Sequence, residues 1–181
     1  MVSQKDSLLV HIDALYRSAL YLVKNENNAD DLVQETYLKA FKSLRNGEII
    51  SNERAWLFKI LMNTFINQYR KTKTEPSLVD FDSIESFHES IKEEVLTSPI
   101  AENEIEFDEW LDSDIKKALE ALPDDFRLVI LLSTVEGFSY KEISKMLECP
   151  IGTVMSRIYR GRKMLKEKLT GYAKKHGYER E

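Results

Sequence analysis

The chain has little of the residue types on which several classes of protein depend. It contains one cysteine, Cys149, so no internal disulfide can form, and this composition fits a reducing compartment. Only 6 glycines are present, without a phosphate-binding glycine-rich loop, and the 3 histidines are scattered. No stretch approaches the roughly 18 apolar residues of a membrane span, and the N-terminus does not resemble a signal peptide. We therefore predict a cytoplasmic protein that is not an enzyme and has no metal site or cofactor.

Charge is strongly divided along the chain, although the formal net charge is only −5. Residues 74–112 include 13 acidic residues and 1 basic residue, whereas residues 139–181 include 11 basic and 5 acidic residues. A polar, highly charged segment buries too little apolar surface to fold alone. We therefore predict an acidic, flexible linker at residues 74–104, between an N-terminal domain at residues 1–73 and a C-terminal domain at residues 105–181.

Apolar residues recur at helical spacing in both predicted domains, and no segment alternates as a strand would. In the N-terminal domain the pattern predicts helices over residues 8–22, 29–44 and 55–71. Asn28 is the expected N-cap of the second helix. The aromatic residues of the third helix lie in its apolar run, so we interpret them as core residues rather than as surfaces for base stacking; they are Trp56, Phe58 and Phe65.

The C-terminal domain shows clear signals for helix ends. Pro123 separates two helical patterns, and Gly137 can end the second of them. Ser139 and Glu142 have the spacing of a capping box, which predicts a short helix ending near Leu147. A last helix is expected over residues 151–169. The predicted fold class is therefore all-α, with two small helical domains joined by a flexible linker.

The segment from Tyr140 to Ile158 resembles a helix-turn-helix, whose second helix would present polar and cationic side chains to the DNA major groove. A basic helix can also be a solvated surface only. The turn lacks the usual glycine and has Glu148 and Cys149 instead. We interpret Cys149 as a small buried side chain rather than as a redox sensor.

Three stretches, NADDLVQETYLKAFKSL, AWLFKILMNTFINQYRK and SYKEISKMLECPIGTVMSRIYRGRKML, together resemble bacterial sigma factors of the extracytoplasmic-function (ECF) type. The resemblance extends from about Leu9 to Leu169 and is greatest for the oxidative-stress subgroup. It implies a sigma region 2 domain and a sigma region 4 domain that bind core RNA polymerase and promoter DNA and direct promoter recognition, melting and transcription initiation. It also implies control by an anti-sigma factor, which would carry any zinc.

The resemblance assigns roles to residues in three helices. Those that match the core polymerase-binding positions are Asp30, Asp31, Gln34 and Glu35. Those that match the −10 DNA-binding positions are Asn63, Asn67, Arg70 and Lys71. Those that match the −35 DNA-binding positions are Thr153, Ser156, Arg157, Tyr159, Arg160 and Lys163. Without the resemblance, Asp30 and Asp31 would be interpreted as first-turn carboxylates that complement the helix dipole.

Two other functions are compatible with parts of this pattern. A helix-turn-helix transcriptional regulator that is not a sigma factor could use the same C-terminal helices, although the receiver domain of a response regulator would need strands among residues 1–71. An adaptor that binds only polymerase or an anti-sigma protein would share the N-terminal pattern. Recognition of promoter DNA by the complex with polymerase separates these functions.

Overall fold

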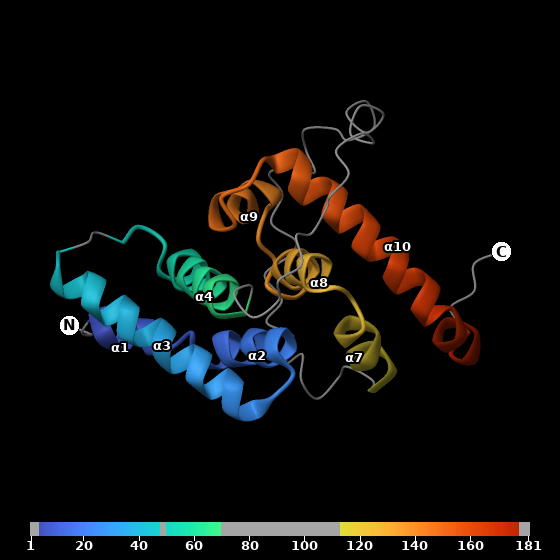
Figure 1. Cartoon of the computed structure of the whole chain (residues 1–181), viewed down its shortest axis with the longest axis horizontal. Helices are drawn as coiled ribbons and strands as arrows, with labels where there is room; N and C mark the ends of the chain where they lie inside the picture. Colours follow the sequence, from blue (N-terminus) through green and yellow to red (C-terminus); the bar gives the residue numbers. More distant parts are fainter. Residues whose placement is uncertain (1–3, 48–49, 70–112, 178–181) are drawn as a thin grey trace. The chain divides into compact units, whose positions relative to one another are not determined.

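The computed structural model describes residues 4–47, 50–69 and 113–177. Within these residues the regular structure is helical and contains no strand (Figure 1), which confirms the predicted all-α class. Two compact units are present, the first with α1–α4 and the second with α7, α8, η3 and α10. The predicted linker at residues 74–104 lies outside the described residues, and so do Arg70 and Lys71. The exact domain boundaries stay predictions.

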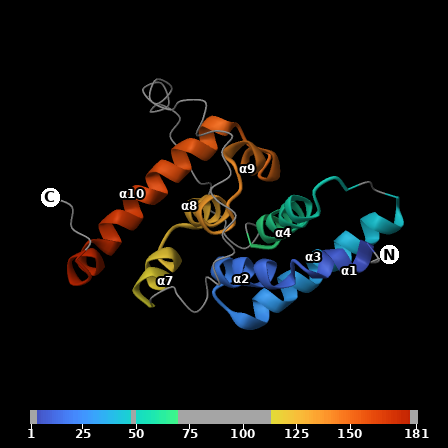
Figure 2. The same cartoon turned by 180° about the vertical axis from the view of Figure 1, so that it is seen from behind.

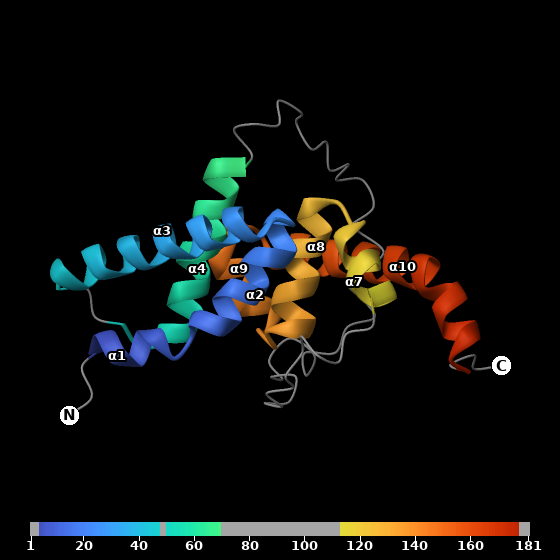
Figure 3. The same ribbon diagram turned by 90° about the horizontal axis from the view of Figure 1, so that it is seen from below.

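The first unit consists of α1 (Gln4–Leu9), α2 (Ile12–Val23), α3 (Glu26–Arg45) and α4 (Glu53–Tyr69). Helix α3 packs against both α2 and α4, as Figures 2 and 3 show. The apolar faces of these helices form the core of the unit. Its fully buried apolar side chains include Leu8, Leu15, Ala19, Leu32, Ala40, Leu57, Leu61 and Met62.

The prediction of one helix over residues 8–22 was wrong, because the chain turns between α1 and α2. The Leu8 carbonyl oxygen accepts a hydrogen bond from the His11 backbone N–H at 3.2 Å. The same oxygen accepts a buried hydrogen bond from the Tyr37 hydroxyl at 2.8 Å. This turn leaves Ile12 42% exposed instead of in the core.

The N-cap of α3 is Asn25 and not Asn28 as predicted. Asn25 has extended backbone angles, and its side-chain oxygen accepts from the Asn28 backbone N–H at 3.0 Å. Both are residues that cap helices well, and the backbone conformation decides between them. Because α3 begins at Glu26, Asp30 and Asp31 lie beyond its first turn, where the helix dipole contributes little.

The second unit contains α7 (Ser113–Glu120), α8 (Asp124–Ile130) and the π-helical turn η3 (Leu131–Val135). Its long helix is α10 (Ile151–Lys175), which packs on both α7 and α8. As predicted, Pro123 separates two helices, and α8 begins at the next residue. Helix α10 ends six residues later than the predicted Leu169.

The short helix α9 (Tyr140–Met146) precedes α10 and begins with the predicted capping box. The Glu142 carboxylate accepts from the Ser139 backbone N–H at 2.8 Å and from its hydroxyl at 2.7 Å, and the Ser139 Oγ lies 3.3 Å from the Glu142 backbone N–H. After α9, Glu148 has a φ of 51°, the conformation for which glycine is favoured. Glu148 therefore occupies, without being glycine, a turn position whose backbone conformation favours glycine.

Candidate nucleic-acid interface

Helix α10 lies very close to α8, and Gly161 permits this approach. A Cβ atom on Gly161 would lie only 2.9 Å from Cγ1 of Ile130. One turn and two turns earlier, Ile158 and Val154 are buried, as the helix-turn-helix pattern predicts. These three residues define the inner face of α10, so the side chains on the opposite face are directed outwards.

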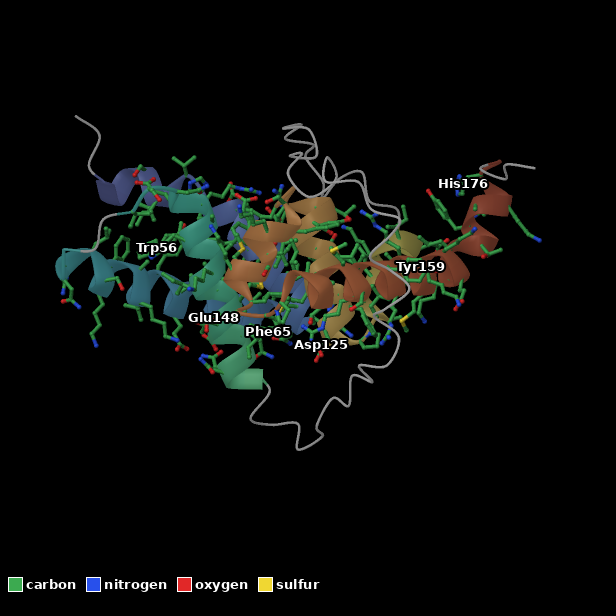
Figure 4. All side chains as sticks on the ribbon, turned by 90° about the horizontal axis from the view of Figure 1, so that it is seen from above. Trp56, Phe65, Asp125, Glu148, Tyr159 and His176 are labelled. Carbon is green, nitrogen blue, oxygen red and sulfur yellow. The ribbon has the colours of Figure 1, made fainter. Side chains whose placement is uncertain are left out.

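The predicted −35 contacts lie on or beside this outward face. Tyr159 is 52% exposed and is labelled on α10 in Figure 4. Lys163 is exposed as well, whereas Thr153 and Arg160 are half-buried. The Ser156 hydroxyl donates to the Thr153 carbonyl oxygen at 3.0 Å, which leaves its lone pairs available as acceptors. The first turns of α10 therefore combine hydroxyl, phenol and cationic groups on one surface, which suits contacts with base edges and phosphates.

Arg157 differs from the other predicted −35 contacts because it is held within the unit. Its Nη2 atom lies 3.4 Å from Oδ2 of Asp125 in the first turn of α8, and the Arg157 side chain is only 15% exposed. This arrangement assigns Arg157 a part in joining α10 to α8. Cys149 is near the same pair and is half-buried, not buried as predicted. Burial raises the pKa of the Cys149 thiol more than Arg157 lowers it, so the thiol stays protonated at neutral pH.

Sequence reasoning missed Arg127, which organises the corner between α7 and α8. Its side chain is 1% exposed and donates to the backbone oxygens of Glu120 at 3.1 Å and Leu122 at 2.9 Å. It also forms an ion pair of 2.5 Å with Asp124. The only sequence signal is a carboxylate three residues before a single arginine in an apolar helix, because the carbonyl partners depend on the fold.

In the first unit, the four predicted polymerase contacts lie together on α3. Asp30, Asp31 and Gln34 are exposed. Glu35 is engaged instead: one carboxylate oxygen lies 2.7 Å from Nζ of Lys39, and the other accepts a hydrogen bond from the Gln68 amide on α4. The structure therefore brings Glu35 into contact with the helix that carries the predicted −10 contacts.

Helix α4 carries Asn63, which is half-buried, and Asn67, which is exposed. Both side-chain amides can donate and accept hydrogen bonds. Phe58 and Phe65 are buried, which confirms their interpretation as core residues, and Trp56 is half-buried. The Arg54 guanidinium lies over the Phe58 ring at 5.3 Å from its centroid. Phe58 and Phe65 thus contribute to helix packing rather than to an open surface for base stacking.

Among residues 4–47, 50–69 and 113–177, no three His, Cys, Asp or Glu side chains come close enough to hold a metal ion. Over the same part of the chain, no helix has the length and apolar character required to cross a membrane.

Comparison with known proteins identifies both units. The family described as "Sigma-70 region 2" matches residues 9–75, and "Sigma-70, region 4" matches residues 113–165. The ECF RNA polymerase sigma factor SigE of Mycolicibacterium smegmatis is 34% identical over 99% of this chain, which spans only 65% of that relative. The ECF RNA polymerase sigma factor EcfG of Rhodopseudomonas palustris is 35% identical over 90% of this chain and 83% of its own length.

A solved structure agrees with these matches. The sigma factor RpoE of Bartonella quintana, solved in complex with the anti-sigma factor NepR, is 34% identical. The similarity covers 92% of this chain and 96% of that chain, with a TM-score of 0.64. The finer assignment to the oxidative-stress subgroup stays a prediction.

Proposed function

Because the chain belongs to the family of ECF RNA polymerase sigma factors, we propose that it binds core RNA polymerase and directs the enzyme to a set of promoters. The factor would supply promoter recognition and melting, while the polymerase performs the chemistry. It would act in the cytoplasm, where a bacterial polymerase meets its template. The match of residues 9–75 to sigma region 2 favours this function over that of a helix-turn-helix regulator of another kind.

The observation that carries the proposal is the division of α10 into two faces. Its inner face is buried through Val154 and Ile158, and at Gly161 the helix lies directly against Ile130 of α8, so its outer face has a fixed direction. Side chains held on a rigid helix can discriminate base edges, which is how a helix-turn-helix reads the major groove. We assign the −35 contacts to this face; they are Thr153, Ser156, Tyr159, Arg160 and Lys163, with Arg157 as their neighbour.

The first unit would provide the polymerase and −10 contacts. Asp30, Asp31 and Gln34 form an exposed polar row on α3 that suits docking on a cationic or polar protein surface. Asn63 and Asn67 on α4 can bond to bases of the −10 element. Arg70 and Lys71 would follow with contacts to phosphate; both lie outside the described residues.

An anti-sigma protein is the proposed regulator. The similar sigma factor RpoE was solved with the anti-sigma factor NepR. A protein that covers the exposed row of α3 or the outer face of α10 would prevent docking or DNA binding without any chemical change in the factor.

Run-off transcription tests the proposal. Bacterial core polymerase would be combined with the protein and a pool of promoter fragments that vary at the −10 and −35 positions. We expect selective initiation from a subset that shares both elements. Tight binding to polymerase without initiation would indicate an adaptor, and DNA binding without polymerase binding would indicate a helix-turn-helix regulator of another kind.

A further inference from the structure

Four side chains form a polar cluster between α3 and the C-terminal half of α4. Lys39 Nζ lies 2.7 Å from Oε1 of Glu35 and donates to Oγ1 of Thr64 at 3.0 Å. The Gln68 amide donates to Oε2 of Glu35. Thr64 is 1% exposed, so the Lys39 ammonium reaches the buried edge of the helix pair. We call Glu35, Lys39, Thr64 and Gln68 the α3–α4 cluster.

The α3–α4 cluster fixes the end of α4 at the place where the proposed −10 contacts lie. Thr64 and Gln68 directly follow Asn63 and Asn67 in the sequence. Adjacent residues on a helix point about 100° apart, so holding Thr64 and Gln68 against α3 sets the directions of Asn63 and Asn67. Gln68 is one residue from the end of α4 at Tyr69, where helices readily fray.

Glu35 differs from the other proposed polymerase contacts in how its side chain is held. Both of its carboxylate oxygens have partners within the first unit, whereas Asp30, Asp31 and Gln34 lie on the exposed row of α3. A group that touches α4 on one side and adjoins a docking surface on the other can influence both.

We propose that the α3–α4 cluster positions α4 for recognition of the −10 element, with Lys39, Thr64 and Gln68 as positioning residues and Glu35 as their common partner. This inference rests on the proposed function. Its cause is geometric: the cluster holds the last turns of α4 against α3 before DNA arrives, so the direction in which Asn67 leaves the helix is already set and less backbone entropy is lost on binding. A merely structural or solvated cluster would not affect the choice of base.

The proposal is tested by exchanging the carboxylate of Glu35 on α3 and the amide of Gln68 on α4. Gln68→Glu places two carboxylates opposite each other and should separate the end of α4 from α3. The double variant Glu35→Gln with Gln68→Glu restores one amide and one carboxylate in reversed positions. Asn27→Asp, at an exposed residue in the first turn of α3, adds the same single negative charge outside the cluster and is the matched control.

The measurement is open-complex formation by the reconstituted holoenzyme at saturating core polymerase, on the selected promoter and on the same promoter with −10 substitutions. We expect Gln68→Glu to reduce the preference for the selected −10 element about fivefold or more, the size expected for coupled residues in contact. The double variant should recover that preference to within about twofold of the wild type, in the manner of a double-mutant cycle. Affinity for core polymerase should be unchanged by Gln68→Glu and reduced in the double variant, because only the latter lacks the Glu35 carboxylate.

Several results would overturn the inference. No recovery in the double variant, or an equal loss in Asn27→Asp, would mean that the cluster does not position α4. If Gln68→Glu fails to fold, Lys39→Met takes its place, and Lys39→Arg is expected to restore the preference because it keeps the charged donor. Failure of the wild-type protein to support initiation from any promoter would overturn the proposed function, and the inference with it; failure of the exchange alone overturns only the inference.

Discussion

The two helices proposed to contact DNA differ in how the protein holds them. Helix α4 is buried along most of its length, through Leu57, Phe58, Leu61, Met62 and Phe65, and it carries only two Lys or Arg side chains. Helix α10 has 25 residues, buries few of them, and carries eight Lys or Arg side chains. The contribution of α4 therefore depends on its neighbours, whereas α10 acts mainly through its own side chains once its inner face is docked.

This difference agrees with the tasks proposed for the two helices. Melting requires that separated bases be captured in a defined geometry, which favours a helix fixed on several sides. Reading duplex DNA in the major groove requires an exposed helix with cations for the phosphates. Substitutions should therefore affect α4 through packing and α10 through individual contacts, and the following changes test that distinction.

The largest effect is expected at Arg127. This buried side chain holds the corner between α7 and α8, the two helices on which α10 packs. Arg127→Met should lower the free energy of unfolding of the second unit by about 3 kcal/mol, because two backbone carbonyls and Asp124 lose a charged donor. Hydrogen exchange of the α7, α8 and α10 amides measures this unit separately from the first. Arg157→Met is the control, since its hydrogen bond to Asp125 is long, at 3.4 Å, and should be worth much less. Equal effects of the two substitutions would show that the corner is not essential.

Arg160 tests whether α10 reads bases directly. Arg160→Ala should weaken holoenzyme binding to the selected promoter by about 1–3 kcal/mol and relax specificity at one −35 position, if the guanidinium bonds to a base. Competition with −35 variants measures this effect. Lys166, an exposed residue further along α10, is expected to contact phosphate and provides the contrast. Lys166→Ala should weaken binding to all sequences alike and reduce the slope of log affinity against log salt by about 0.9. A uniform loss for Arg160→Ala as well would assign Arg160 to phosphate.

Tyr37 tests the packing that supports the first unit. Tyr37→Phe should lower the free energy of unfolding by about 1–2 kcal/mol, because the buried Leu8 carbonyl oxygen loses its hydroxyl donor. Burial raises the pKa of Tyr37 to about 12, from 10.0, so the unfolded chain ionises first. Wild-type stability should therefore fall as pH rises from about 10 to 12, and the phenylalanine variant should lack that part of the loss. Denaturant unfolding at several pH values measures both effects; the same slope in both proteins would contradict this explanation.

Local features of this fold could be predicted from the sequence, and long-range ones could not. The capping box of Ser139 and Glu142 was predictable because both partners lie within one helical turn. The break between α1 and α2 was not, because it depends on Tyr37, which is distant in the sequence. The choice of Asn25 over Asn28 depends on backbone angles that side-chain type alone does not determine.

The same division applies to the candidate site. The outward positions of Tyr159 and Lys163 follow from helical periodicity once the buried residues of α10 are recognised. The pairing of Arg157 with Asp125 and of Glu35 with Gln68 joins different helices, so no spacing rule reveals it. For Arg157 and Glu35, the roles implied by the family resemblance describe only part of what the side chain does, because each also has a partner inside the protein.

The smallest predicted effect concerns the turn before α10. Glu148 has a φ of 51°, and a side chain in this left-handed region costs energy that glycine avoids. Glycine in turn loses more backbone entropy on folding, so the two terms partly cancel. Glu148→Gly should therefore raise the free energy of unfolding by about 0.5–1 kcal/mol. Glu148→Ala is the control, because it removes the carboxylate but keeps the strain. Stabilisation by alanine as large as that by glycine would attribute the effect to charge, and the turn would then be no constraint on how α10 is presented.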